Sequence, residues 1–310
     1  MDTRQLRYYA AIFEHRNLSR AASECNVAQS AISHHLSNLE TELGVQLFIR
    51  KPRGMEPTAA GIKLYEHAKL ILRAIGAAEQ DMKQLSDEVS GDFAIGLPYS
   101  VMQTIALPLM KTVMEDFPKV RLSIVESLSG TNFSNLLASD VDLAFFYNPQ
   151  KDDRISMVPI LEEQVLCVGK RDIVGDTDEP LTFDQLTTLP VLLLRQGVYS
   201  RALVDRPALL TKLEAKAPLH LNSVAGIITG LTAGLGCTIA PKVFVGQQLR
   251  DGILHARPVI KPSLSRTLYM GHLRERPSTR LQETMVGLLR TLIANEVRKG
   301  TWEATLFEAG

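Results

Sequence analysis

Residues 17–44 read NLSRAASECNVAQSAISHHLSNLETELG, and this stretch decides the fold of the N-terminal part of the chain. Its pattern predicts a short helix, a tight turn and a second helix. Ser19 is placed to cap the first helix, because a serine hydroxyl accepts the free N–H groups of a first helical turn. Ala21 and Ala22 are small enough for another helix to approach closely. Asn26 interrupts the pattern, and asparagine tolerates the left-handed backbone that a tight turn requires.

The second helix of this stretch has an apolar face and a polar face. Apolar residues recur at spacings of four, three and four, which predicts a buried stripe of Ile32, Leu36, Leu39 and Leu43. The residues off that stripe are polar: Gln29, Ser30, Ser33, His34 and Asn38. Such side chains donate and accept hydrogen bonds at base edges and phosphates. The stretch therefore predicts a helix-turn-helix that reads DNA.

The composition is that of a globular protein with more than one domain. A chain of 310 residues predicts two or three domains, and its 45% of hydrophobic residues is ordinary. Lys and Arg together number 34, as do Asp and Glu, so the net charge indicates no partner. Residues 1–58 carry seven basic and six acidic side chains, whereas strong non-specific DNA binders carry a basic surplus. The surplus here is local, at Arg50, Lys51 and Arg53.

The sequence indicates a cytoplasmic location. The N-terminus lacks the apolar region of a signal peptide, and no stretch approaches the roughly 20 apolar residues that span a bilayer, so we expect no membrane partner. The three cysteines, Cys25, Cys167 and Cys237, are widely separated and lack metal-ligand spacing. We therefore expect reduced cysteines, no metal and no cofactor.

A basic hairpin is predicted after the second helix. Residues 45–50 are β-prone, a turn with glycine follows at 51–54, and residues 55–57 form a second short strand. One interpretation is a plain surface hairpin with solvated charges. Beside a helix-turn-helix we favour a wing whose three basic side chains contact phosphates.

A regular apolar pattern follows Thr58, which we expect to cap a long helix. Apolar residues recur at alternating spacings of four and three: Leu64, Ala68, Ile71, Ile75, Ala78, Met82, Leu85 and Val89. A helix over residues 59–89 would be about 45 Å long. This heptad seam could lie on the chain's own C-terminal part, but its length favours a helix–helix dimer contact.

From Ser90 onward, short strands alternate with helices. Strands are predicted at residues 93–97, 120–125, 141–146, 165–169, 190–194, 237–240 and 268–271, and helices at 105–117, 200–215, 224–233 and 281–297. Such alternation predicts parallel βαβ units in an open α/β sheet. The fold class is therefore α/β with an N-terminal head rich in helices. The last residues, with Trp302, are expected to form a loosely held tail.

The order of these parts resembles the LysR-type transcriptional regulators. The motifs that carry the resemblance lie mostly in the first 61 positions, at residues 18–22, 27–33, 39–44, 47–50 and 57–61. Looser matches lie at residues 234–241 and at the strand beside Asp142. Residues 95–97 and 126–131 are most similar to the nitrogen-assimilation-control subgroup.

The resemblance implies a division into domains and a set of partners. A winged helix-turn-helix domain would cover residues 1–58, and a dimerisation helix residues 59–90. An effector domain similar to periplasmic binding proteins would have two α/β subdomains, residues 91–162 with 267–300 and residues 163–266, followed by a tail at 301–310. The implied partners are double-stranded DNA with AT-rich inverted repeats, a small effector, RNA polymerase, and further copies of the chain in a homodimer and homotetramer.

The resemblance also assigns site residues. The expected DNA contacts are Ser19, Arg20, Gln29, Ser30, Ser33, His34, Arg50, Lys51 and Arg53, while His35 is expected on the solvated surface. Helix N-termini and their hydroxyls hold an anionic effector in the family, which agrees with the partial positive charge there. The expected effector contacts are Ser100, Ser129, Gly130, Thr131, Tyr147, Tyr199, Ser200, Arg201 and Asn222. Each hydroxyl could instead be an ordinary helix cap without a ligand.

The effector is expected to be a small anionic metabolite, an aromatic or aliphatic acid, that changes the oligomer geometry on the promoter. Tyrosines at 99, 147 and 199 would suit an aromatic acid, and only Arg195 or Arg201 offers a cationic partner in the predicted cleft.

Other classes of function stay open at this point. One alternative is a regulator that acts without a ligand or through redox chemistry, although Cys167 and Cys237 lie in apolar strands where cysteine acts as a small hydrophobe. A stand-alone solute-binding protein would not need the helix-turn-helix head. The sequence has no HExxH, GxSxG or GxxxxGK[ST] motif, so we expect no enzyme.

Overall fold

The computed structural model describes residues 1–52, 54–83, 89–194, 207–217, 219–275 and 278–308. The chain divides into two compact units, Met1–Glu88 and Val89–Gly310. Within the described ranges, none of the helices has both the length and the apolar character needed to cross a membrane.

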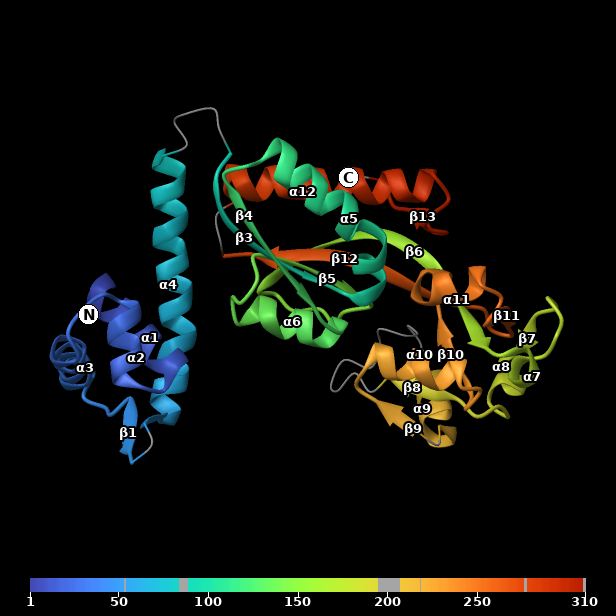
Figure 1. The fold of residues 1–310 in the computed structure, drawn as a ribbon, viewed down its shortest axis with the longest axis horizontal. Helices are drawn as coiled ribbons and strands as arrows, with labels where there is room; N and C mark the ends of the chain where they lie inside the picture. The colour runs from blue at the N-terminus through green and yellow to red at the C-terminus, as the bar shows by residue number, and fades with distance from the viewer. Residues whose placement is uncertain (53, 84–88, 195–206, 218, 276–277, 309–310) are drawn as a thin grey trace. The chain divides into compact units, whose positions relative to one another are not determined.

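The first unit contains the predicted helix-turn-helix. Its helices are α1 (Thr3–His15), α2 (Leu18–Glu24) and α3 (Gln29–Leu43) (Figure 1). The expected cap at Ser19 is wrong. The helix begins at Leu18, two residues earlier than a cap at Ser19 implies, and the side chain of Asn17 accepts the N–H groups of Ser19 and Arg20. The expectation for Asn26 is confirmed, since its φ of 53° is left-handed.

Apolar stripes from the three helices form the core of this unit. Ile12, Ala21 and Ile32 are each fully buried. The predicted stripe of α3 is confirmed except at its end, where Leu43 is 38% exposed. The hydroxyl of Tyr9 donates to the backbone carbonyl of Gly61 and so ties α1 to α4 (Ala59–Lys83).

The predicted wing is an antiparallel pair of strands, β1 (Phe48–Lys51) and β2 (Gly54–Pro57). Glu40 fixes the wing to α3, because one of its carboxylate oxygens accepts the N–H groups of Leu47 and Phe48 at 2.7 and 3.2 Å. Gly54 has a φ of 139°, and a Cβ there would lie 2.3 Å from the carbonyl oxygen of Arg16. The turn therefore requires glycine.

The long helix α4 is capped as expected, since the hydroxyl of Thr58 accepts the N–H of Gly61 at 3.0 Å. Its apolar seam is only partly available to a partner. Ala68 is fully buried in the core of the chain's own head, against which Leu64 also packs. Farther along, Ile71 is 37% exposed and Met82 is 69% exposed. Leu85 lies outside the described residues, so the dimer seam stays a prediction for the second half of the helix.

The second unit is built around a mixed sheet, whereas a parallel sheet was expected. The strand order is β4-β3-β5-β12-β6-β11-β7. The parallel part is formed by β3 (Gly91–Leu97), β4 (Val120–Glu126) and β5 (Leu143–Tyr147), with α5 (Tyr99–Asp116) and α6 (Ser129–Leu137) between them in sequence. The long strands β6 (Ile155–Gly169) and β12 (Leu264–Leu273) enter the sheet antiparallel, which the alternation of helices and strands does not reveal.

These two long strands carry the chain between two cores. On β6, Leu161 belongs to one core and Val165 to the other. On β12, Leu268 belongs to the same core as Leu161, and Leu264 belongs to the same core as Val165. The expected subdomain boundaries near residues 163 and 267 stay a prediction, which the two cores support.

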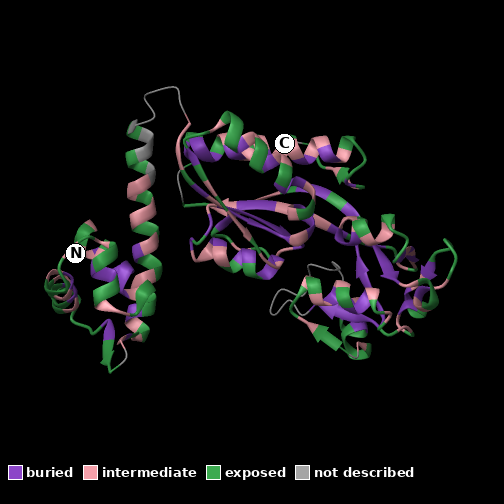
Figure 2. Cartoon of the chain, viewed as in Figure 1, coloured by how far each residue is buried: buried purple, intermediate pink, exposed green. Residues whose placement is uncertain are grey.

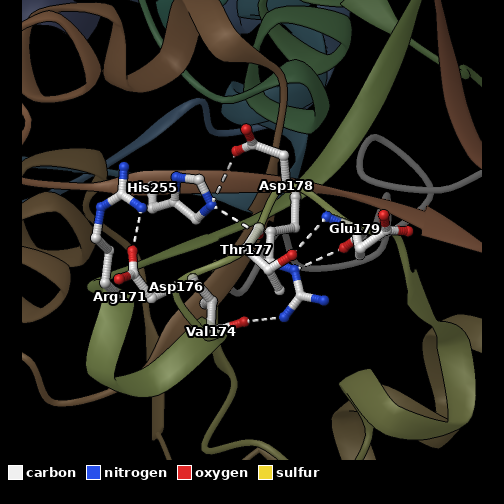
Figure 3. A network of polar contacts seen from close by, with 8 residues as sticks. Arg171, Val174, Asp176, Thr177, Asp178, Glu179 and His255 are labelled. Carbon is white, nitrogen blue, oxygen red and sulfur yellow. Dashed lines mark hydrogen bonds and ion pairs between the residues drawn. The ribbon is translucent and has the colours of Figure 1, made fainter.

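The remaining elements are α7 (Arg171–Val174), β7 (Leu181–Thr182), α8 (Phe183–Leu186), β8 (Leu192–Leu194), α9 (Pro207–Lys216), β9 (Leu219–Leu221), α10 (Val224–Thr232), β10 (Cys237–Ala240), η2 (Lys242–Val245), α11 (Gly246–Arg250) and β11 (His255–Ile260). Most of the sheet is buried, while the helices expose one side (Figure 2). Two buried side chains of β11 anchor the acidic loop after α7. His255 Nε2 lies 3.0 Å from the carbonyl oxygen of Thr177 (Figure 3). Arg257 Nε donates to the carbonyl oxygen of Glu179 at 2.8 Å.

The C-terminal residues are not a loose tail, so that expectation is wrong. The helix α12 (Arg280–Arg298) is followed by β13 (Thr305–Leu306), which pairs with β6. Trp302 is fully buried, and its indole N–H donates to Glu163 Oε2 at 2.8 Å. A large aromatic side chain whose polar atom also finds a partner is enough to hold such a segment in place.

Candidate functional site

Hydrogen bonds join expected DNA contacts from three elements of the head. The hydroxyl of Ser19 on α2 donates to Gln29 Oε1 on α3 at 3.0 Å. The guanidinium of Arg50 on β1 donates to the hydroxyl of Ser33 at 3.2 Å. Because Gln29 and Ser33 are one helical turn apart, the four side chains form one polar surface across α2, α3 and the wing.

The other expected DNA contacts differ in their exposure and in their partners. Arg20, Ser30 and His34 are exposed. Lys51 pairs with Glu56 at 3.3 Å, which partly compensates its charge, while Arg53 lies outside the described residues. His35 packs edge-on against Tyr8 with ring centroids 5.1 Å apart, so it belongs to the packing of the head.

The second unit contains a small cavity between the core that includes Tyr147 and the core that includes Leu194 and Phe244. The cavity volume is about 30 Å³, roughly the space of one water molecule. One side is lined by residues of α5, α6 and β5, and the other by Leu194, Thr238 and Phe244. The structure therefore has a small, partly open pocket with both polar and apolar lining beside some of the residues expected to contact an effector.

Three of the expected effector contacts line this cavity: Ser100, Ser129 and Tyr147. Three others do not: Gly130, which is buried, and Thr131 and Asn222, which are exposed. Tyr199, Ser200 and Arg201 lie outside the described residues, as does Arg195.

Arg266 on β12 is a cation of the cavity that the sequence reasoning missed. Its guanidinium donates to Glu163 Oε1 from Nε at 2.8 Å and to the Ser100 hydroxyl from Nη2 at 2.7 Å. It also lies 3.6 Å over the ring of Tyr147, in a cation–π contact. Glu163 and Arg266 are each the middle residue of a polar triplet, residues 162–164 and 265–267, and these triplets were the available signal.

The polar groups around the cavity are mainly hydrogen-bond donors. The Ser100 oxygen accepts from Arg266, and the Ser129 oxygen accepts from the backbone N–H of Tyr147 at 3.2 Å. Each hydroxyl hydrogen is thereby left to donate to a ligand. The helices that begin at Tyr99 and Ser129 have no side-chain cap, so their first N–H groups add positive potential. Such an arrangement fits an anionic oxygen.

Tyr147 contributes a buried polar atom without a partner. Its side chain lines the cavity, and its hydroxyl makes no hydrogen bond within the described part of the chain. Burial raises the pKa of Tyr147 well above the usual range, so the hydroxyl keeps its proton. An unsatisfied buried hydroxyl is costly, and a ligand oxygen would satisfy it.

The structure brings two cysteines together that are far apart in sequence. Cys167 on β6 and Cys237 on β10 are both fully buried on adjacent strands. A hydrogen bond with Cys237 and burial raise the pKa of Cys167 far above its usual range. Because the thiolate is the reactive form, Cys167 is a poor target for peroxide.

Two family models match the chain. The bacterial regulatory helix-turn-helix protein, lysR family, matches residues 3–62, and the LysR substrate binding domain matches residues 86–294. The nitrogen assimilation regulatory protein nac of Klebsiella aerogenes is 32% identical over 244 residues, which cover 78% of this chain and 79% of that protein. The transcriptional dual regulator OxyR of Escherichia coli is 26% identical over 269 residues, with 86% and 88% covered.

Solved structures share the fold. A full-length OxyR variant from Pseudomonas aeruginosa superposes with a TM-score of 0.70 at 19% identity, covering 94% of each chain. Full-length CbnR in complex with its target DNA superposes with a TM-score of 0.64 at 18% identity, covering 96% of this chain and 99% of that one.

Proposed function

The chain belongs to the LysR family of DNA-binding transcriptional regulators, and from this premise we propose that it senses a small organic acid in the cavity at Arg266. Binding of the acid would change the geometry of the oligomer on promoter DNA. The observation that carries the proposal is the gathering of polar groups around one small cavity. Ser100, Ser129 and Arg266 line it, and two helices without a side-chain cap begin beside it.

The charge of the cavity favours weak binding of a singly charged acid over binding of an acid with several charges. Arg266 is already paired with Glu163, whose side chain is 1% exposed, so the pair is close to neutral. A carboxylate would therefore bind mainly through oriented donors rather than through excess charge. Either an aromatic or an aliphatic acid satisfies this requirement.

The small size of the cavity points to a conformational change. Its volume is about 30 Å³ and it is partly open, so we expect its two sides to move apart when an acid of several carbon atoms binds. The long strands β6 and β12 pass from one core to another beside the cavity and are the elements that would bend. This motion is the proposed route from effector to DNA.

On the DNA side we propose that Gln29, Ser33 and Arg50 read an AT-rich inverted repeat as a dimer or tetramer. A glutamine amide pairs with adenine in the major groove, and two heads supply the specificity that one short helix lacks. Contact with RNA polymerase stays a prediction of the family resemblance.

A gel-shift assay with the protein's own promoter tests the DNA interface. Gln29→Ala and Ser33→Arg should each abolish specific binding, while circular dichroism shows an intact fold. Thr41→Ala is the matched control, because it lies on the same helix with its hydroxyl bonded back to Ser37 at 2.8 Å. Unchanged affinity in the first two variants would refute the interface.

Thermal shifts with small acids and their amides test the effector site. Carboxylic acids should raise the melting temperature more than the matched neutral amides do. Ser129→Ala should weaken the response, whereas Thr131→Ala, on the same helix but outside the cavity, should not. An equal response to acids and amides would refute an anionic effector.

A further inference from the structure

A continuous chain of hydrogen bonds joins the cavity to the C-terminal segment. Ser100 accepts from Arg266, Arg266 donates to one oxygen of Glu163, and the other oxygen of Glu163 accepts from Trp302 at 2.8 Å. The four residues are between 0% and 6% exposed. The chain of bonds therefore runs through a dry interior, where a change at one end is felt at the other.

This chain of bonds lies where the protein would have to bend. Arg266 and Glu163 are directly opposite on β12 and β6, between the residues that belong to the two cores. On the other edge of β6, Thr305 of β13 lies opposite Glu162. A shift of the Arg266–Glu163 pair therefore acts on the C-terminal segment through Trp302 and through strand pairing.

The C-terminal segment also touches the second side of the cavity. Glu303 pairs with Lys242 on η2 at 2.8 Å, and η2 contains the cavity residue Phe244. Residues 301–307 thus contact β6, through Trp302 and β13, and also η2 on the second side of the cavity. They are placed to respond when the two sides of the cavity separate.

We propose that Glu163 and Trp302 are positioning residues of the effector cavity, which couple anion binding at Arg266 to the C-terminal segment of residues 301–307. The inference rests on the proposed effector site. An anion that takes hydrogen bonds from Arg266 competes with Glu163 for them. A buried carboxylate that loses its cation is strongly destabilised, so Glu163 has to move and Trp302 moves with it.

The protein has a built-in reporter of this event. Trp302 is the sole tryptophan of the chain, so intrinsic tryptophan emission comes from this position alone. Formate is the matched probe because it is the smallest carboxylate, and formamide is its neutral isostere. In the full-length chain, formate should raise the melting temperature and shift the emission, while formamide and sodium chloride at equal ionic strength should do neither.

Glu163→Gln tests the coupling directly. The amide oxygen still accepts from Arg266, but the compensating charge is gone, so formate should bind about tenfold more tightly, about 1.4 kcal/mol. The emission should lose its response to formate. Thr131→Ala is the matched control, because Thr131 is exposed and lies outside both the cavity and the chain of bonds. It should keep the wild-type response.

Trp302→Phe provides a second test if Glu163→Gln does not fold. Without the indole N–H, Arg266 is the main hydrogen-bond partner that Glu163 retains, so an anion displaces Glu163 from Arg266 less readily. Formate affinity should therefore fall about fivefold, which is about 1 kcal/mol. Glu308→Gln removes an exposed carboxylate just beyond the C-terminal segment and should leave that affinity unchanged. Both affinities are measured by thermal shift.

The outcomes separate this inference from the proposed function. If formate stabilises the protein while the emission stays constant, the coupling is refuted and the effector site stands. If formate has no effect on the melting temperature, the effector site fails and the coupling fails with it. Unchanged formate affinity in Glu163→Gln or in Trp302→Phe would also overturn the positioning role.

Discussion

Replacing only one partner of the Arg266–Glu163 pair should destabilise the protein far more than replacing both. Arg266→Met leaves the Glu163 carboxylate, whose side chain is 1% exposed, without its cation. Loss of one partner from a buried ion pair costs about 3–5 kcal/mol. The lost stacking on Tyr147, at 3.6 Å, adds about 1 kcal/mol.

The double variant, with methionine at both positions, should recover most of that loss. Apolar residues of similar volume often replace a buried ion pair at little cost, so we expect a net destabilisation of no more than about 2 kcal/mol. The residual cost comes from the Trp302 indole N–H and the Ser100 hydroxyl, which lose their bonds to the pair. The two single substitutions are therefore strongly non-additive.

Urea unfolding of the full-length chain, followed by the emission of Trp302, measures these differences. The sole tryptophan lies in the second unit, so the signal reports the unfolding of that unit. Each single variant should lower the urea concentration of the midpoint strongly, while the dependence of the unfolding free energy on urea stays unchanged. A double variant whose loss equals the sum of the two single losses would refute the view that the pair acts as one unit.

Three further predictions concern the rest of the chain. The double substitution Ile71→Asp and Ile75→Asp should convert the oligomer to monomers in analytical ultracentrifugation and lower operator affinity at least tenfold; wild-type affinity in a monomer would contradict the role of the seam. Peroxide should leave operator affinity unchanged, and mass spectrometry should find Cys167 and Cys237 unmodified. The pKa of Cys167 is raised, so this thiol stays protonated and little of the reactive thiolate is present. Asn17→Ala should destabilise the head by about 1 kcal/mol in thermal unfolding, and no loss would mean that the cap at α2 is dispensable.

Local patterns explain why the head was predictable from its residues. Helical periodicity and the left-handed tolerance of Asn26 act over a few positions, so the turn and the buried stripe of α3 follow from neighbouring residues. The cap was misplaced by two positions for the same local reason. Asn17 and Ser19 both suit a cap, and only the start of the helix at Leu18 distinguishes them.

The candidate effector site was predictable only in part. Ser100 and Ser129 follow strands of the parallel sheet, and the βαβ pattern places both beside the same edge. Gly130 and Thr131 directly follow Ser129 in sequence, yet helix geometry turns them away from the cavity. Sequence proximity to a helix start therefore identified the region and not the contacts within it.

By itself, the sequence determined the helix-turn-helix, the wing, the long helix and the α/β character of the second unit, because hydrogen bonds and periodicity over short separations define them. The tertiary structure decided which charges meet. Arg266 and Glu163 are 103 positions apart, and the antiparallel register of β12 on β6 sets them opposite each other. The same register leaves room for Trp302 to reach Glu163 from 139 positions away, which turns an expected loose tail into part of the core.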